Sequence, residues 1–128
     1  MSAVVLLVED EESLCGVEAR ALEKRGYRVL CAPSAEEART LLENNPVDLV
    51  VADIVLPGQG GLDFMLERKS HENGGPRFLF TSGKINVAHA SFRMIAEQFG
   101  DVRALQKPFT VEEFLAAVDG ALSGPPQA

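Results

Sequence analysis

Acidic, hydroxyl and basic side chains follow separate apolar runs in this chain, a pattern suited to phosphoryl chemistry. Glu9 and Asp10 follow the first run, Asp53 ends another, and Lys107 follows the last. A carboxylate such as Asp53 can act as a nucleophile and form an aspartyl phosphate. Clustered carboxylates repel one another unless a cation neutralises them, and a hard ion such as Mg²⁺ takes oxygen ligands and keeps several waters. These residues are therefore candidates for a magnesium and phosphoryl site.

Two hydroxyl side chains, Thr81 and Ser82, follow the apolar run Phe78–Phe80. Because side chains alternate along a strand, only one of the two can face a site at the strand end. That hydroxyl and the amino group of Lys107 could hold the oxygens of a phosphoryl group, and such positioning with charge stabilisation is most of what phosphoryl transfer requires. A lone Asp53 would more commonly end a strand or cap a turn. The convergence of several strand ends favours the site.

Five short apolar segments, interpreted as strands, alternate with five segments of helical spacing. The strands are expected over residues 3–8, 28–32, 49–53, 78–80 and 102–106. This alternation predicts an α/β fold, a doubly wound five-stranded parallel sheet with right-handed crossovers and helices on both faces. The first, third and fourth strands are the most apolar and are expected at the centre. In such sheets ligands collect at the carboxyl ends of strands, where the candidate residues lie.

Capping signals and apolar stripes define the expected helices. Ser34–Glu37 and Thr110–Glu113 each have the pattern of a capping box. Gly26 is interpreted as the C-terminal cap of the first helix. Helical spacing groups Val17 with the apolar residues of the first helix and places Val111 on the apolar stripe of the last helix.

Composition narrows the class of protein. A length of 128 residues indicates one domain, expected over residues 1–122 with a tail or linker start over 123–128. The net charge of −7 argues against a nucleic-acid surface and suits metal cations or basic protein partners. The absence of a long apolar run or a secretory signal predicts a cytoplasmic domain without a membrane span. Cys15 and Cys31 lack metal-ligand spacing and are expected to be reduced and buried.

Taken together and in order, these motifs closely resemble the receiver domain of bacterial two-component response regulators. The segments Thr81–Gly83 and Leu105–Phe109 are most similar to receivers of hybrid histidine kinases. The resemblance implies the flavodoxin-like fold with strand order 2-1-3-4-5, and it covers nearly the whole chain. The matching segments are Leu6–Glu11, Asp53–Pro57 with Gly60 and Gly61, Thr81–Gly83 and Lys107–Phe109.

The resemblance assigns roles to the acidic residues. Asp53 is implied to be the phosphoacceptor, which also contributes to the Mg²⁺ site. Asp10 is implied to bind Mg²⁺ directly, and Glu9 to assist through water. The backbone carbonyl of Val55 is implied to be a further metal ligand. The same resemblance implies no other cofactor.

The remaining site roles fall on the later strands. Ser82 is implied to be the hydroxyl switch residue and is favoured over Thr81 because Gly83 occupies the small-residue position of the family. Lys107 is implied to contact the phosphoryl group. The peptide bond between Lys107 and Pro108 is expected to be cis, as in the family.

The expected function is a phosphorylated switch of two-component signal transduction, which is a signalling domain and not an enzyme in its own right. Its partner is expected to be a histidine kinase or a histidine phosphotransfer protein. An alternative is a receiver within a hybrid kinase that serves as a phosphorelay intermediate, and the oligomeric state stays open. A phosphatase of the haloacid-dehalogenase type is disfavoured because Val55 stands where a second Asp is usual. A flavodoxin-like cofactor module is disfavoured because four acids, Glu9–Glu12, would repel a phosphate.

Overall fold

The computed structural model describes residues 3–53, 76–82 and 102–123, without the side chains of Ser82 and Val102. Within these ranges a five-stranded parallel sheet has the order β2-β1-β3-β4-β5, which confirms the predicted topology. β3 lies at the centre between β1 and β4, as the apolar content of the three strands predicted. The strands are β1 (Val4–Val8), β2 (Arg28–Ala32), β3 (Leu49–Asp53), β4 (Arg77–Ser82) and β5 (Val102–Gln106).

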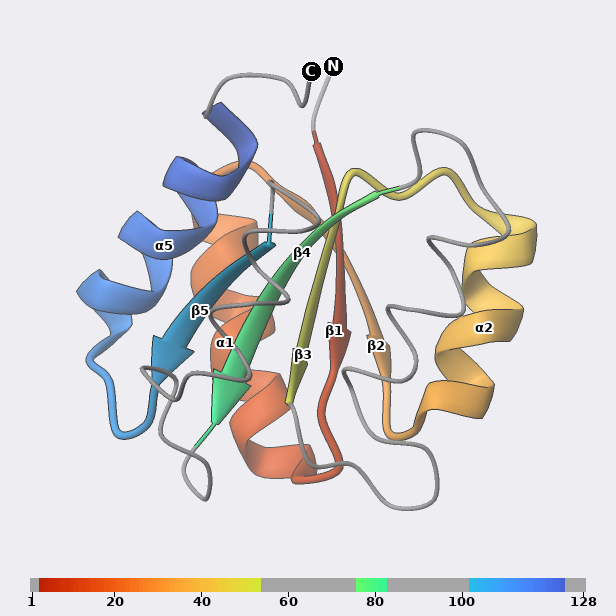
Figure 1. Ribbon diagram of the computed structural model, residues 1–128, viewed down its shortest axis with the longest axis horizontal. Coiled ribbons are helices and arrows are strands. Elements are labelled where there is room, and N and C mark those ends of the chain that lie inside the picture. The colour runs from red at the N-terminus through yellow and green to blue at the C-terminus, as the bar shows by residue number, and fades with distance from the viewer. Residues whose placement is uncertain (1–2, 54–75, 83–101, 124–128) are drawn as a thin grey trace.

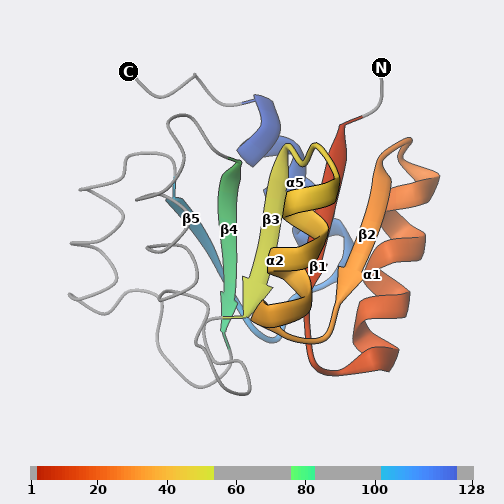
Figure 2. The same ribbon diagram turned by 90° about the vertical axis from the view of Figure 1, so that its right-hand side faces the viewer.

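Helices cover both faces of the sheet (Figures 1 and 2). α1 (Glu12–Lys24) and α5 (Val111–Ser123) pack on one face, and α2 (Ala35–Asn44) packs on the other. Two of the five expected helices, one between β3 and β4 and one between β4 and β5, lie outside the described residues. None of the described helices has the length and apolarity needed to cross a membrane.

The core follows from the alternation of side chains along strands that are buried on both faces. Leu6 and Phe80 point toward α2, whereas Leu7 and Leu79 point toward α1 and α5. All four are buried, and full burial of one such side chain contributes about 1.5–3 kcal/mol. The sheet therefore supplies most of the apolar surface that both helical layers cover.

The predicted helix ends are confirmed. At the end of α1, Gly26 has a positive φ of 98° and its N–H donates to the Glu23 carbonyl at 3.0 Å, while the Tyr27 N–H donates to the Leu22 carbonyl at 3.1 Å. This pair of bonds is the Schellman arrangement, which favours glycine at the left-handed position. At the start of α5, Thr110 Oγ1 accepts from the Glu113 N–H at 3.0 Å, and Glu113 Oε1 accepts from the Thr110 N–H at 2.8 Å. These caps fix the end of α1 and the start of α5, the two described helices on that face of the sheet.

The cap of α2 is simpler than a full capping box. Ser34 Oγ accepts from the Glu37 N–H at 3.3 Å, which satisfies one of the free amides of the first turn. This bond confirms the predicted start of the helix.

Three side chains expected in the core are exposed instead. Val17 and Val111 are 56% and 47% exposed. The side of α1 that faces the sheet carries Cys15 and Leu22, and Val17 is rotated away from it. Cys31 is also exposed, because β2 is an edge strand with only β1 beside it. Apolar spacing predicted the helices correctly but not which of their apolar residues meet the sheet.

A polar cluster anchors α5 to the end of α1. Asp119 Oδ2 accepts from Arg25 Nη2 at 2.6 Å, and Asp119 Oδ1 accepts from the Tyr27 hydroxyl. The hydrogen bond from Tyr27 lowers the pKa of Asp119 most; burial opposes it, and the bond and charge of Arg25 add to the lowering, so the net shift is downward. Arg77 Nη1 of β4 donates to the carbonyl of Ala121 at 2.7 Å near the C-terminal end of the helix. α5 is therefore held at both its side and its end.

We expect Asp119→Ala to lower the free energy of unfolding by about 1–2 kcal/mol at neutral pH, because it removes bonds from two partners of which one is solvent-screened. The depressed pKa of Asp119 means that this contribution is present above the usual Asp range and is lost as pH falls through the folded-state value. Urea unfolding at neutral and acidic pH measures the difference. The matched control is Tyr27→Phe, which removes one bond only; equal losses in both variants at every pH would contradict the prediction.

Candidate functional site

The predicted site residues lie at the carboxyl edge of the sheet. Glu9 directly follows β1, Asp53 is the last residue of β3, and Lys107 directly follows β5. In register, Asp53 pairs with Thr81. Parallel pairing thus brings residues from distant parts of the sequence to one edge.

Lys107 joins two of the carboxylates. Its Nζ lies 2.9 Å from Asp53 Oδ2 and 3.4 Å from Glu9 Oε1. The three side chains are only 23%, 14% and 7% exposed, so water screens the contacts weakly. The Lys107–Pro108 peptide bond is cis, as expected. The structure therefore brings together Glu9, Asp53 and Lys107 as predicted.

Burial and neighbouring charges shift the pKa values of Glu9 and Lys107. Burial raises the pKa of Glu9, and the neighbouring Asp53 adds to this effect while Lys107 opposes it. Burial lowers the pKa of Lys107, but its hydrogen bond to Asp53 and the charge of Glu9 outweigh burial, so the net shift is upward. The amino group therefore stays protonated at neutral pH and is a lasting positive charge beside Asp53.

The structure describes the other predicted site residues in less detail. Asp10 is exposed directly beside Glu9. Ser82 ends β4 and pairs with Gln106, the residue before Lys107, but its side chain lies outside the description. Thr81 is buried, with 4% exposure. Val55 lies outside the described residues, so the choice between Ser82 and Thr81 and the role of the Val55 carbonyl stay predictions.

The donor set suits a hard cation. Among the described side chains, no group of three or more His, Cys, Asp or Glu is arranged to hold a metal ion. Glu9 and Asp53 are joined by Lys107 instead, whereas the Asp10 carboxylate is open to solvent. Mg²⁺ needs only one or two carboxylates besides its waters, so Glu9, Asp10 and Asp53 fit its chemistry.

Sequence reasoning missed Glu18, a buried carboxylate of α1 near the site. It is 7% exposed and, among the described residues, makes no hydrogen bond or ion pair. Burial, followed by the charge of Glu9, raises the pKa of Glu18 to about 7. Its burial could have been predicted from its spacing, because Cys15, Glu18 and Leu22 recur at helical intervals on the side of α1 that faces the sheet.

We expect Glu18→Gln to stabilise the domain increasingly as pH rises from about 5 to about 8. Because the folded pKa of Glu18 lies above its ordinary value, the folded state binds this proton more tightly, and wild-type stability falls as pH rises toward about 7. The glutamine cannot ionise and escapes this loss, which reaches about 2–3 kcal/mol. Urea unfolding in chelator measures it.

The matched control for this experiment is Glu23→Gln, an exposed position of the same helix. Its effect on stability should be small and independent of pH. A stability difference between wild type and Glu18→Gln that stays constant across the same pH range would contradict a buried carboxylate with a raised pKa.

A doubly wound parallel sheet with the strand order 2-1-3-4-5 defines the class of flavodoxin-like α/β proteins. The response regulator receiver domain family matches residues 5–119. The chain therefore belongs to this family and is a receiver domain of two-component signalling.

Individual relatives agree with this assignment. The chain is 38% identical over 120 residues to the sensor kinase CckA of Brucella abortus, a match covering 91% of this chain and 12% of that protein. It is 32% identical over 119 residues to the transcriptional regulatory protein YvrH of Bacillus subtilis, covering 91% and 48%. The solved non-phosphorylated HemR receiver domain of Leptospira biflexa has 32% identity and a TM-score of 0.84, covering 99% of both chains. The chain spans less than half of either curated relative.

Proposed function

We propose that Asp53 accepts a phosphoryl group from a phosphohistidine donor and that the domain acts as a conformational switch in the cytoplasm. The observation that carries this proposal is the 2.9 Å contact between Lys107 Nζ and Asp53 Oδ2 at the carboxyl edge of the sheet. It places a permanent positive charge beside a single carboxylate at the end of a rigid central strand. That arrangement serves phosphoryl transfer, which depends on positioning and charge stabilisation.

In the proposed step, a carboxylate oxygen of Asp53 forms a bond to phosphorus as the bond from phosphorus to the donor imidazole breaks. The imidazole nitrogen keeps the electron pair, and Asp53 becomes an acyl phosphate. Lys107 shifts from the carboxylate toward the phosphoryl oxygens, which now carry the negative charge. The Ser82 hydroxyl, or alternatively that of Thr81, donates a hydrogen bond to the same group, and this bond couples phosphorylation to β4.

The acidic turn after β1 is proposed to complete the site. Asp10 and Asp53, with the Val55 carbonyl, would hold Mg²⁺, and Glu9 would orient a bound water. The ion supplies charge neutralisation for the incoming phosphoryl oxygens. Glu9 is already drawn toward the site by Lys107 at 3.4 Å, so its carboxylate is oriented before any phosphoryl group arrives.

We expect acetyl phosphate with Mg²⁺ to add one phosphoryl mass to the wild type and none to Asp53→Asn, because the amide cannot act as the nucleophile. Intact-protein mass spectrometry measures the gain. Asp10→Asn should require more Mg²⁺ for the same rate, since one hard anionic ligand is lost. The control is Asp48→Asn, whose carboxylate accepts from the Val4 N–H at the opposite edge of the sheet. A full mass gain in Asp53→Asn would overturn the proposal.

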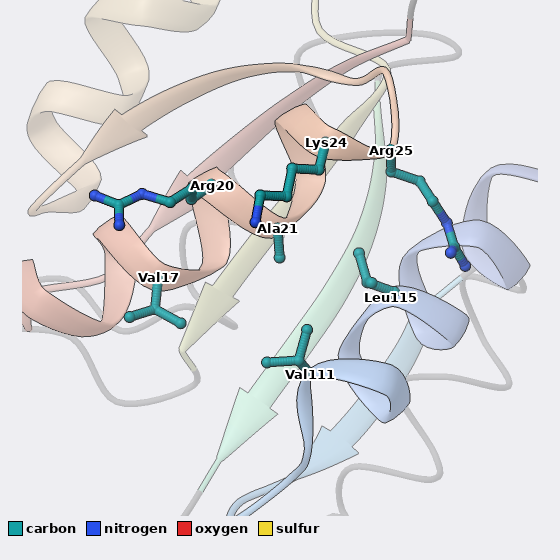
Figure 3. A pocket seen from close by; sticks show the side chains of 7 residues that line it. All are labelled: Val17, Arg20, Ala21, Lys24, Arg25, Val111 and Leu115. Atoms are coloured by element: carbon teal, nitrogen blue, oxygen red, sulfur yellow. The ribbon is translucent and has the colours of Figure 1, made fainter.

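A groove between α1 and α5 supports a protein as the phosphodonor (Figure 3). It has a volume of about 410 Å³, and the exposed Val17 and Val111 lie on its two sides. Arg20 and Lys24 line the same groove, a basic patch on a chain of net charge −7. An apolar helix with acidic flanks fits this surface. We propose that the helix carrying the phosphohistidine docks here, beside the site edge where α1 and α5 begin.

We expect Val17→Asp to slow phosphotransfer from a phosphorylated histidine phosphotransfer protein about tenfold, because a charge in the apolar groove costs roughly 1–2 kcal/mol of docking free energy. Phosphorylation by acetyl phosphate, which needs no docking, should stay within about twofold of wild type. Radiolabel transfer assays measure both rates. Thr40→Asp on the exposed side of α2 is the matched control, and an unchanged protein-dependent rate in Val17→Asp would exclude the groove.

A second possibility, a receiver within a hybrid kinase acting as a phosphorelay intermediate, is favoured by one observation. The relative with 38% identity is a sensor kinase, and the match covers 12% of its length. In that case the phosphoryl group moves from Asp53 onward to a second histidine. Transfer from phosphorylated domain to a histidine phosphotransfer protein distinguishes this role from a terminal switch.

A further inference from the structure

Two thiols from different elements meet in one cavity beside the acidic turn. Cys15 lies near the start of α1 and Cys31 lies on β2, and both line a cavity of about 370 Å³. The carboxylates of Glu9, Asp10 and Glu12 line the same cavity. The cavity therefore joins the proposed metal-binding turn to a pair of cysteines.

The sheet register explains why the thiols lie together. Cys31 pairs with Leu7 of β1, whose side chain points toward α1. Parallel partners in register point to the same face of a sheet, so Cys31 also points toward α1. Cys15 belongs to the cluster of buried residues that contains Leu7. Both thiols thus occupy the space between α1 and the edge of the sheet.

The two cysteines differ in exposure. Cys31 is exposed and Cys15 is buried. Burial, followed by the neighbouring Cys31 thiol, raises the pKa of Cys15 above its ordinary value. Cys15 is therefore a protonated thiol at neutral pH, and an oxidant in solution reaches Cys31 first.

We propose that Cys15 and Cys31 form a reversible intramolecular disulfide when the domain meets a peroxide. The thiolate of Cys31 attacks one peroxide oxygen and breaks the O–O bond, which gives a sulfenic acid and, after protonation, water. The sulfur of Cys15 then attacks the Cys31 sulfur, and the departing hydroxide takes the Cys15 proton as a second water. Overall, two thiols and hydrogen peroxide give one disulfide and two waters.

The bond would tie the first turns of α1 to β2 directly behind the acidic turn. Cys15 donates its N–H to the Glu11 carbonyl at 3.0 Å, so a pull on Cys15 is passed to the start of the helix. The Glu9 N–H donates to the Ala32 carbonyl at 3.0 Å, next to Cys31. The disulfide therefore encloses the segment that positions Glu9 and Asp10. Its effect on phosphorylation rests on the proposed function, whereas its formation does not.

The test is oxidation of the reduced chain with hydrogen peroxide, followed by mass spectrometry. The wild type should lose the mass of two hydrogens, regain it with a reducing agent, and give a non-reduced tryptic fragment joining the peptides of Cys15 and Cys31. Cys15→Ser should instead accumulate a sulfenic acid on Cys31 that dimedone traps. Cys31→Ser should resist at the same peroxide concentration. Circular dichroism confirms that each variant folds, and Cys15→Ala replaces Cys15→Ser if the serine variant does not.

Asp53→Asn separates this proposal from the proposed function, because it should form the same disulfide although it cannot be phosphorylated. Oxidised wild type should react with acetyl phosphate several-fold more slowly than reduced wild type, and reduction should restore the rate. An unchanged rate would contradict the coupling to the acidic turn. Gain of oxygen on Cys31 without the two-hydrogen loss, or a disulfide only between chains, would overturn the proposal.

Discussion

At the carboxyl edge of the sheet, the amino group of Lys107 contacts the carboxylates of both Glu9 and Asp53. This contact depends on the arrangement of the strands. β5 is separated from β3 by β4, so Lys107 must extend past the end of β4 to reach Asp53. Lysine meets this requirement because its long, flexible side chain ends in a compact charge. Arginine would instead present a planar group with a fixed fork of donors. The strand order therefore explains why a long side chain after β5 makes this contact.

The site carries more negative charge than positive charge. Glu9, Glu18 and Asp53 face a single lysine, and Asp10 adds a further acid at the rim. Burial, with the repulsion of neighbouring carboxylates, raises the pKa of both Glu9 and Glu18, and Lys107 offsets only part of this rise. Such a site is less stable than a neutral core of the same size but attracts cations more readily. Function is thus gained at a cost in stability.

The sheet, the caps and the convergence of Asp53 and Lys107 at one edge could be predicted from the sequence, because each depends on local patterns or on strand ends. The strand order came from the resemblance to receiver domains. It did not reveal which apolar residues of a helix meet the sheet. Val17 has the right type and spacing but is rotated outward, whereas Glu18 has the wrong type and is buried. Cys31 was misassigned because a free cysteine is usually buried, whereas this one lies on the edge strand β2 and is exposed. Which side of a helix faces the sheet, and whether a strand lies at the edge, are decided by tertiary packing.

α1 connects all of these features. Its start follows the acidic turn, its inner side carries Cys15 and Glu18, and its outer side contributes Val17 to the groove. Its end is fixed to α5 through Asp119. Because α5 begins shortly after Lys107, the groove and the lysine belong to one packed unit. α1 and α5 therefore link the proposed docking groove to the carboxyl edge of the sheet that carries Asp53.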